Sequence, residues 1–439
     1  MKDTKSAYAT TPFWWEDAAP SPCPPPIVPR TADVAIIGAG YAGLCAALTL
    51  ARAGRLVIIF DKQHPGAGGS SRNGGIASGN IRPNMAKLLH RFGETKALAI
   101  EAEAIEARRF LAELITQEQL DCDYQPCGRF LGAIGPIDYE SQARAADLLQ
   151  RRFGVASYAV PKAGQHDYIG TDFYHGGSVR MDIAGLHPGK LHAGLLKASC
   201  RAGALLVADT AVTGIESQPG LHRLRGSFGE ITTGAVMICT DAYTDGLDPW
   251  LRRRIVPVRS RIIATEPLPA NLMQKLMPRK MMYGDKRELG FYFRPSPDGR
   301  RILFGGRDGA TKGDPASATN LLFAGMTSIF PELAEVRLSH SWFGFVGMHR
   351  DMIPRIFTHQ HRLYATGFCG SGVAWAPWVA RCAALKLLGQ PISSPFDMRP
   401  PAAIPFYRGK PYFMPAVMAY YRLKDWRMAQ KNAIPPPSS

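Results

Sequence analysis

The chain has 439 residues, of which 46% are hydrophobic and 20% are charged. This length predicts two or three compact regions, and the composition is that of an ordinary soluble globular protein. No run of eighteen apolar residues occurs, which excludes a helix that spans a bilayer. The formal net charge is +16, but the basic residues are dispersed and no known nucleic-acid module is present. We therefore expect no nucleic acid among the partners.

The N-terminus and the cysteines indicate the compartment. The chain opens with polar residues and an aromatic patch at Phe13, Trp14 and Trp15, which is unlike a secretory signal. The eight cysteines are scattered, and Cys122 and Cys127 have no second pair to complete a zinc site. The sequence thus predicts a cytoplasmic protein with reduced thiols and no bound metal.

The first folded element follows a proline-rich stretch. Residues 20–30 contain six prolines, which predicts an extended tether. A β-branched run at 33–37 predicts a strand, an alanine- and leucine-rich stretch at 44–53 predicts a helix that ends at Gly54, and 56–60 predicts a second strand.

A glycine-rich turn separates this first strand from the helix. Gly38 permits a tight turn, Gly40 lets the backbone approach a pyrophosphate, and Gly43 lets the helix pack closely on the strand. The helix N-terminus adds free N–H groups and a positive dipole. Asp61 ends the second strand and can bind a ribose hydroxyl, which disfavours NADP and leaves FAD or NAD. The predicted dinucleotide-binding residues of this part are Gly38, Ala39, Gly40, Tyr41, Ala42, Gly43, Asp61 and Lys62.

Three features favour FAD over NAD. A second glycine-rich stretch carries hydroxyl groups suited to a pyrophosphate and a flavin. A third such stretch follows a predicted strand and precedes a helix, so that another helix start can face the flavin. No second complete dinucleotide motif lies between them, so the electrons are expected to come directly from the substrate. The added residues are Gly69, Ser70, Ser71, Arg72, Asn73, Gly74 and Gly75, then Gly367, Gly370, Ser371, Gly372 and Val373.

The order of the remaining predicted elements indicates a mixed fold. Helices and strands alternate at first, and strands dominate later. We expect an α/β and α+β protein, with a polar hairpin turn at 359–361. Helices are predicted at 84–118, 139–153 and 377–388, and strands at 204–215, 235–239, 255–265, 291–293, 302–304 and 363–366.

In combination, several segments resemble the FAD-dependent amine and amino-acid oxidase superfamily, which is typified by D-amino-acid oxidase. The closest resemblance is to the γ-glutamylputrescine oxidase-like branch, and it runs over most of the chain. The segments that carry it are Phe13-Trp14, 38–43, 68–75, Leu186-His187-Pro188, 240–244, 264–268 and 420–423.

The resemblance implies a Rossmann-like FAD-binding domain and a discontinuous, sheet-based substrate domain above the flavin. It also implies that Val212 contacts the adenine through its backbone. FAD is expected to bind without a covalent bond, although Cys369 and His349 are chemically able to form one. The implied segments are 30–85, 186–245 and 337–400 for the FAD domain, 86–185 and 246–336 for the substrate domain, 1–29 for an N-terminal extension and 401–439 for a C-terminal tail.

The sequence departs from the branch near the chemistry. Ser71 stands for a glycine, Cys369 and Ser371 replace a serine and a histidine, and His349 stands where a threonine is expected. Glycine-type oxidases have an arginine in the stretch that matches 344–347, and none is present. An unsubstituted α-amino acid is therefore a less attractive substrate than an amine or a substituted amino acid.

Five residues are candidates for contact with the substrate. His349 can position or deprotonate an amine, because the ordinary histidine pKa lies near neutrality, and a structural histidine is the alternative. Arg294 can bind a carboxylate through two hydrogen bonds or can be a surface residue. Aromatic residues can form the pocket wall or belong to the core. These aromatic candidates are Tyr292, Trp342 and Trp375.

The predicted activity is oxidation of the C–N bond of a small amine or substituted amino acid. A neutral amine allows loss of hydride from the adjacent carbon to flavin N5, and the resulting imine hydrolyses. The acceptor that reoxidises the flavin is oxygen, a quinone or a redox protein. Alternatives are a D-amino-acid or N-methyl-amino-acid (sarcosine-type) dehydrogenase, an α-hydroxy-acid oxidant, and a non-catalytic flavoprotein that binds an anionic partner.

Overall fold

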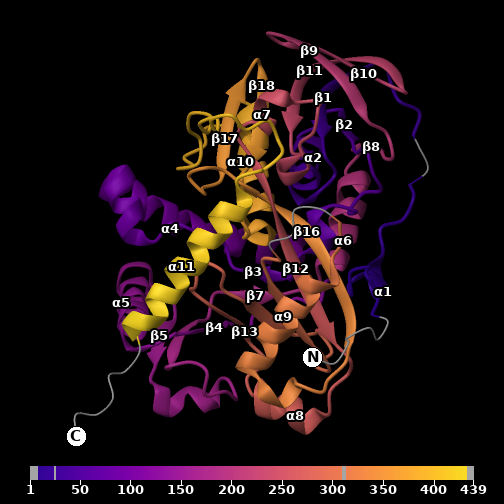
Figure 1. The fold of residues 1–439 in the computed structure, drawn as a ribbon. Coiled ribbons are helices and arrows are strands. Elements are labelled where there is room, and N and C mark those ends of the chain that lie inside the picture. Colours follow the sequence, from indigo (N-terminus) through magenta and orange to yellow (C-terminus); the bar gives the residue numbers. More distant parts are fainter. Residues whose placement is uncertain (1–7, 24–25, 309–312, 433–439) are drawn as a thin grey trace, which may run out of the picture.

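Two large sheets and a surrounding set of helices make up the fold of this computed structural model, which describes residues 8–23, 26–308 and 313–432. In Figure 1 the strands of the first sheet lie in the upper part and most strands of the second lie below. The arrangement confirms the mixed α/β and α+β class. A small third sheet pairs β3 (Ile76–Ala77) with β7 (Ala184–Gly185).

The first sheet has a parallel centre in which β1 lies between β2 and β11. All four residues of β2 are apolar and buried, as expected for a parallel strand covered on both faces. Helices α2 (Tyr41–Arg52), α4 (Met85–Gln117), α6 (Pro188–Arg201) and α10 (Gly372–Leu387) pack on one face. Strands β9 and β10 and helix α7 (Pro249–Arg252) cover the other. The order is β17 (Arg355–His359), β18 (Arg362–Thr366), β11 (Gly229–Ile238), β1 (Thr31–Ile37), β2 (Val57–Phe60) and β8 (Leu205–Val207), and β10 (Leu221–Gly226) and β9 (Val212–Gln218) extend from β11.

The second sheet is mainly antiparallel, with one parallel pair between β4 and β13. Helices α8 (Ala270–Leu276) and α9 (Ala316–Ile329) cover one of its faces in a separate apolar cluster. The strand order is β16 (Leu338–Met348), β12 (Val256–Thr265), β15 (Ile302–Gly306), β14 (Tyr292–Pro295), β13 (Met282–Asp285), β4 (Arg129–Gly132), β6 (Gly177–Arg180) and β5 (Ser157–Val160).

The two sheets divide the chain in an interleaved way. Strands of the first sheet fall in the intervals 30–85, 186–245 and 337–400. Strand β16, in the third of these intervals, pairs with β12 along its whole length and so belongs to the second sheet. The interval 337–400 therefore contributes to both sheets, and the domain boundaries themselves stay a prediction.

Most predicted helices lie where the pattern placed them. The boundary of α10 was wrong, because the helix begins at Gly372 and contains Pro377, which was expected near its start. The turn at 359–361 is confirmed, since Gln360 and His361 have positive φ between β17 and β18. The helices are α2 (Tyr41–Arg52), α3 (Gly69–Arg72), α4 (Met85–Gln117), α5 (Pro136–Phe153), α6 (Pro188–Arg201), α7 (Pro249–Arg252) and α10 (Gly372–Leu387), with short 3-10 turns at Lys162–Asp167, Asp241–Tyr243 and Pro331–Leu333.

The described segments nearest the two termini take part in the fold. The N-terminal aromatic patch leads into α1 (Trp15–Ala18), and Trp14 is fully buried in a cluster with Trp342. The C-terminal tail forms a long helix, α11 (Met414–Asn432), which runs diagonally across the front of the molecule in Figure 1 and contacts α5. Among the described helices, none combines the length and apolarity needed to cross a membrane.

Replacement of Trp14 by alanine is expected to destabilise the protein strongly. The side chain is 0% exposed, and removing a buried tryptophan costs about 3–5 kcal/mol of unfolding free energy. Urea unfolding in the presence of excess FAD measures the change in unfolding free energy. Trp426→Ala is the matched control, because Trp426 is 58% exposed and its loss is expected to cost about 0.5 kcal/mol or less. Equal effects of the two substitutions would contradict the assigned role of Trp14.

Candidate functional site

A cavity of about 1570 Å³ lies between the two sheets. It is larger than the roughly 300–1,000 Å³ of a pocket for a drug-sized ligand. One wall is formed by the helix starts and glycine-rich segments of the first sheet, and the other by strands β12, β13, β14 and β16 of the second. A long cofactor and a separate substrate can both be held in such a space.

Three helix N-termini border this cavity. The N-cap residues of α2, α3 and α10 are Gly40, Gly68 and Ser371, and none of them caps its helix with a side chain. Free N–H groups at a helix start, with the positive end of the helix dipole, bind phosphates and other anions. The cavity wall therefore fits the pyrophosphate and the electron-rich edge of a flavin.

The turn before α2 brings two stretches of backbone unusually close together. Gly38 has φ +105°, and a Cβ built on it would lie 2.9 Å from the carbonyl oxygen of Cys239. A Cβ on Gly43 would lie 1.8 Å from the carbonyl oxygen of Gly38. Only glycine fits at both positions. The sequence prediction for this turn agrees with the packing seen here.

Asp61, which directly follows β2, is hydrogen-bonded to the same turn. Its carboxylate accepts hydrogen bonds from the N–H groups of Ala39 at 2.8 Å and Gln63 at 3.0 Å. Burial raises the pKa of Asp61, and these two N–H donors oppose that shift. A carboxylate accepts about four hydrogen bonds, so capacity remains for a ribose hydroxyl. The neighbouring Lys62 forms an ion pair with Asp245 at 2.6 Å.

The second glycine-rich segment is held by donors from distant parts of the chain. Trp14 Nε1 donates to the carbonyl of Asn73 at 2.8 Å, and Trp342 Nε1 donates to the carbonyl of Arg72 at 2.9 Å. Trp15 Nε1 donates to Ser71 Oγ at 2.8 Å. The aromatic patch near the N-terminus thus fixes the backbone of a segment that lines the cavity.

Arg294, on strand β14, is hydrogen-bonded to the same segment. Its guanidinium is buried and donates to the carbonyls of Gly75 at 2.8 Å and Leu186 at 2.7 Å. Burial lowers its pKa to about 10. Arg294 is 1% exposed, so the alternative of a surface residue is wrong. The side chain is not among the cavity-lining residues, and its role in substrate binding stays a prediction.

The third glycine-rich segment follows β18 and is anchored by Asp241. The buried carboxylate accepts from the Gly367 N–H at 2.7 Å and from Thr366 Oγ1 at 3.0 Å. Burial raises the pKa of Asp241, against the effect of these donors. The anchor fixes the start of α10 relative to the first sheet.

Most of the predicted cofactor residues line the cavity. Five do not, and they lie behind the wall: Ala39, Gly43, Ser71, Gly75 and Gly367. Those on the wall are Gly38, Gly40, Tyr41, Ala42, Asp61, Lys62, Gly69, Ser70, Arg72, Asn73, Gly74, Val212, Gly370, Ser371, Gly372 and Val373.

Tyr292 is the one candidate for substrate contact that lies on the cavity wall. Its ring lies against Gly74, where a Cβ would be 2.8 Å from Cε2, and its hydroxyl is 2.9 Å from Ser260 Oγ. Burial raises the pKa of Tyr292 to about 12, so the hydroxyl stays protonated at neutral pH. Tyr292 therefore lies where the cofactor side meets the second sheet.

Three other candidates are not brought to the cavity. His349 is buried behind the third glycine-rich segment, where its Nδ1 lies 3.3 Å from the carbonyl oxygen of Ile353. Burial, and then the charge of Arg355, lowers the pKa of His349 to about 3, so we expect a neutral imidazole near pH 7. Trp342 and Trp375 are core residues whose indole N–H groups donate to backbone carbonyls.

Sequence reasoning missed a group of basic and aromatic residues that line the cavity. Their spacing in the sequence gives no common pattern, because they come from five separate segments. The only signal was the positive net charge, whose basic residues are dispersed along the sequence. The missed cavity-lining residues include Arg82, Arg129, Lys286, Arg307, Tyr421 and Lys424.

The fold and the cavity together define a dinucleotide-binding oxidoreductase. A family model described as FAD dependent oxidoreductase matches residues 33–385. The chain belongs to this family, which confirms the resemblance inferred from its motifs, and FAD is its cofactor.

Individual relatives agree with this assignment. The chain is 30% identical over 428 residues to the probable oxidoreductase OrdL of Rhizobium meliloti, covering 94% of this chain and 97% of that protein. It is 27% identical over 410 residues to the gamma-glutamylputrescine oxidoreductase of Escherichia coli, with coverage of 90% and 93%. The glycine oxidase structure from Geobacillus kaustophilus has the same fold, with a TM-score of 0.71, 20% identity and coverage of 84% and 99%.

Replacement of Gly38 by alanine is expected to abolish stable FAD binding. The added Cβ meets the Cys239 carbonyl at 2.9 Å on a backbone with positive φ. Gly54→Ala is the control, because Gly54 also has positive φ but no atom lies within 4 Å of its Cβ position; it is expected to lose about 1–2 kcal/mol of stability and to keep FAD. The FAD content of the purified proteins, read from absorbance, checks both. Normal FAD in Gly38→Ala would refute the close approach.

The depressed pKa of His349 is expected to make the protein less stable in acid. The group titrates near 3 when folded and near 6.5 when unfolded. Between these two pKa values the unfolded state binds one more proton than the folded state. The free energy of unfolding therefore decreases as the pH is lowered, by up to about 1.4 kcal/mol per pH unit. Above pH 6.5 His349 is neutral in both states, and its titration no longer lowers the free energy of unfolding.

Urea unfolding between pH 7.5 and 5 measures this slope. In His349→Asn the titrating group is absent, and the slope is expected to be shallower even if the substitution lowers stability at every pH. Slopes that coincide for the two proteins would show that His349 is not held neutral.

Proposed function

We propose that this protein oxidises the C–N bond of a small amine or substituted amino acid. The observation that carries the proposal is the position of Tyr292, where the FAD-binding wall meets a second sheet within one cavity. The family assignment and the relative named gamma-glutamylputrescine oxidoreductase support an amine-type donor. Bound FAD supplies a two-electron acceptor for a hydride from the carbon next to nitrogen.

The charges of the cavity favour the reactive form of an amine. Loss of hydride requires the nitrogen lone pair, which a protonated ammonium lacks. Guanidinium groups of Arg82, Arg129 and Arg307 line the space, and nearby positive charges lower the pKa of a bound amine. The same positive potential stabilises the anionic charge that develops on the reduced cofactor.

The wall also provides a fixed, neutral contact for the substrate. Tyr292 on β14 and Ser260 on β12 form a hydrogen-bonded pair of hydroxyls across β15, which lies between these two strands in the second sheet. Because the Tyr292 hydroxyl stays protonated, the pair can donate to or accept from a polar group without adding charge. His349 is not among the cavity-lining residues, whereas His90 of α4 is. The proposed reaction needs no strong base.

An anaerobic reduction screen tests the proposal. The FAD-loaded protein is mixed with N-methylated amino acids, D-amino acids, γ-glutamylated amines, polyamines and α-hydroxy acids, and bleaching is followed near the oxidised-flavin band at about 450 nm. We expect one amine class to bleach the flavin and to yield a carbonyl product. Air then restores the colour quickly for an oxidase and slowly for a dehydrogenase that uses a quinone or a redox protein. Reduction by α-hydroxy acids alone would overturn the proposal.

A further inference from the structure

Exposed apolar side chains are concentrated in the C-terminal part of the chain. Thirteen large apolar side chains are exposed among the described residues, and five of them lie within 406–426. Single exposed apolar residues are normal on a protein surface, whereas a cluster of them marks a binding surface. The five are Phe406, Tyr412, Tyr420, Leu423 and Trp426, with exposed fractions from 43% to 90%.

The outer face of α11 carries an apolar stripe. Ala419, Leu423 and Trp426 are spaced by four and three residues, which places them on one side of a helix, and all three are exposed. Arg422 and Arg427 are also exposed and lie on opposite flanks of the stripe, at a rotation of about 100° per residue. A surface helix usually turns its charged face to solvent. Here apolar residues occupy the middle of the outer face, between two arginines.

The inner face of the same helix is already in contact with the protein. Tyr421, Lys424 and Met428 line the cavity. Asp425 accepts from two backbone N–H groups of the loop after β13, at 2.7 and 2.9 Å, and Lys424 pairs with Glu288 of that loop. These contacts fix the rotation of α11 about its own axis. The apolar stripe is therefore held facing away from the protein.

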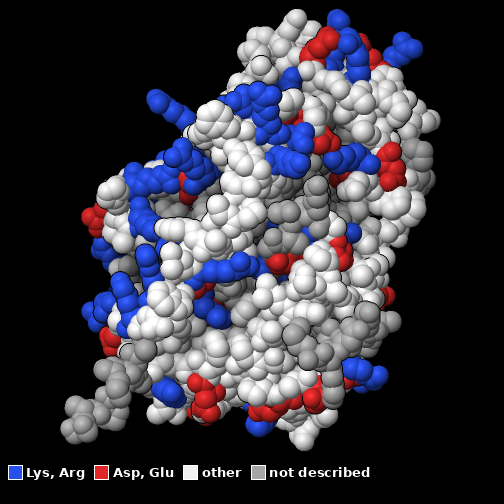
Figure 2. All heavy atoms as spheres, in the orientation of Figure 1, with Lys and Arg blue, Asp and Glu red and all other residues white. Residues whose placement is uncertain are grey.

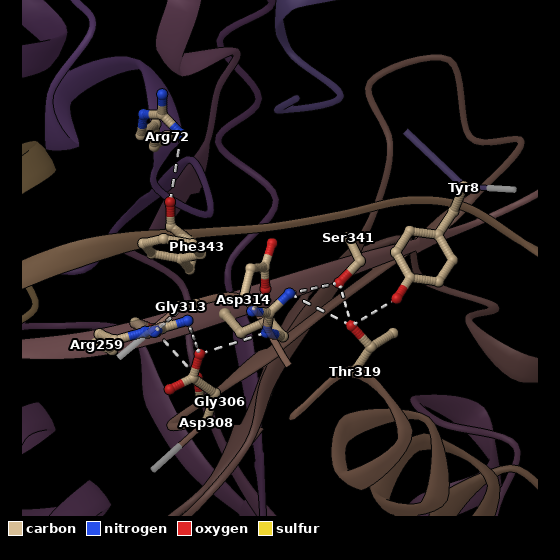
Figure 3. A network of polar contacts seen from close by, with 12 residues as sticks. Tyr8, Arg72, Arg259, Gly306, Asp308, Gly313, Asp314, Thr319, Ser341 and Phe343 are labelled. Carbon is tan, nitrogen blue, oxygen red and sulfur yellow. Dashed lines mark hydrogen bonds and ion pairs between the residues drawn. The ribbon is translucent and has the colours of Figure 1, made fainter. Parts of the chain in front are cut away.

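A buried ionic network fixes the residue that Tyr421 contacts. Arg307 lies over the ring of Tyr421, with 5.6 Å from Cζ to the ring centroid. Asp308, next in the chain, pairs with Arg259 of β12 at 2.9 Å, as Figure 3 shows. It also pairs with Arg261 of β12 at 3.3 Å. The segment that carries Arg307 is thus tied to the second sheet, and α11 packs on a fixed surface.

The charge around the stripe favours an anionic partner. Residues 401–432 contain six Lys and Arg residues and one acidic residue, Asp425, which is engaged on the inner side. In Figure 2, Lys and Arg side chains gather on the flank formed by α4, α5 and α11. A second copy of this chain would bring two positive surfaces together, which costs Coulomb energy. An anionic surface matches this charge.

A lipid bilayer fits the shape and chemistry of this face better than nucleic acid does. Single-stranded nucleic acid is bound in a groove, whereas the stripe lies on the outer side of a helix that crosses the front of the molecule in Figure 1. Leu and Trp side chains enter the boundary between headgroups and acyl chains, and Arg side chains extend to the headgroups. Such a helix lies in the plane of the membrane surface without crossing the bilayer.

We propose that the outer face of α11 binds the surface of an anionic lipid bilayer. Leu423 and Trp426 enter the bilayer boundary, and Arg422 and Arg427 contact lipid phosphates. This inference goes beyond the proposed oxidation and does not depend on it. Because the inner face of α11 lines the cavity, the bound protein holds the cavity next to the membrane, separated from it by the thickness of one helix, about 10 Å.

Cosedimentation of the FAD-loaded protein with vesicles tests the proposal. Vesicles of phosphatidylglycerol and phosphatidylcholine in equal parts are compared with vesicles of phosphatidylcholine alone. We expect binding to the anionic vesicles, little binding to the neutral ones, and weaker binding as salt is added. Trp426→Ala and Leu423→Ala are each expected to weaken binding about tenfold. Arg422→Gln and Arg427→Gln are each expected to weaken it about fivefold.

Two exposed residues away from α11 provide matched controls. Leu321→Ala changes a leucine of α9 that is 49% exposed, and Arg55→Gln removes an exposed arginine between α2 and β2. Both proteins are expected to bind vesicles like the unaltered protein. Because Leu423 and Trp426 are exposed, their replacement is expected to leave FAD content normal. Unchanged vesicle affinity in both Trp426→Ala and Arg427→Gln would overturn the proposal.

Fluorescence quenching by brominated lipid tests whether Trp426 enters the bilayer. Trp426 is 58% exposed, and the other six tryptophans are buried or half-buried. We expect vesicles with bromine on their acyl chains to quench part of the tryptophan emission of the unaltered protein. Trp426→Phe keeps an apolar ring and is expected to bind these vesicles without that quenching. Equal quenching in the two proteins would contradict insertion of Trp426.

Other outcomes would assign the face to a different partner. Absence of binding to anionic vesicles overturns the proposal. If sedimentation velocity then shows self-association that Trp426→Ala abolishes, the face joins two copies of this chain. If single-stranded RNA binds instead, with the same dependence on Trp426 and Arg427, the face is a nucleic-acid site. None of these measurements involves turnover, so a failure of the proposed oxidation is distinguishable from a failure of membrane binding.

Discussion

Four hydrogen-bond donors fix the glycine-rich segment at 69–75, and the rest of the site depends on them. They are the indole N–H groups of Trp14, Trp15 and Trp342 and the guanidinium of Arg294. A glycine-rich backbone loses much conformational freedom on folding, so it is held in one shape only by contacts from outside. Here the contacts come from the N-terminal segment, β14 and β16. These contacts join the cofactor wall to the second sheet beside Tyr292.

The two walls of the cavity have different chemistry. The FAD side consists mainly of backbone, with three helix starts and close contacts that only glycine permits. The opposite side consists of side chains from strands and from α11, and it is rich in arginine. A backbone wall suits a cofactor that does not change, while a wall of side chains can vary with the substrate.

The cofactor site was largely predictable because its signals are local. The turn at Gly38 to Gly43 and the position of Asp61 follow from short-range spacing around one strand and one helix, and the structure agrees with them. The substrate side was not predictable in the same way. Tyr292 and Arg294 are two residues apart and share a face of β14, yet Tyr292 lines the cavity and Arg294 binds buried carbonyls. The two side chains differ because the carbonyls of Gly75 and Leu186 lie within hydrogen-bond reach of Arg294. This long-range packing is not visible in the sequence around β14.

Long-range placement accounts for the other errors. His349 was a reasonable proton carrier by residue type, but the approach of Gly367 and Ile353 buries it and keeps it neutral. The group of Arg82, Arg129 and Arg307 draws on three segments far apart in the sequence. The role of α11 depends on its contacts with the loop after β13, which no pattern within 401–439 reveals.

The most direct test of the account is the rate of anaerobic flavin reduction by an active amine that carries deuterium on the carbon next to nitrogen. If the protein removes hydride from that carbon, deuterium slows the bleaching and is lost from the carbonyl product. Bleaching at the same rate as with the unlabelled amine, with all deuterium retained in the product, would contradict C–N oxidation as the reaction of this protein.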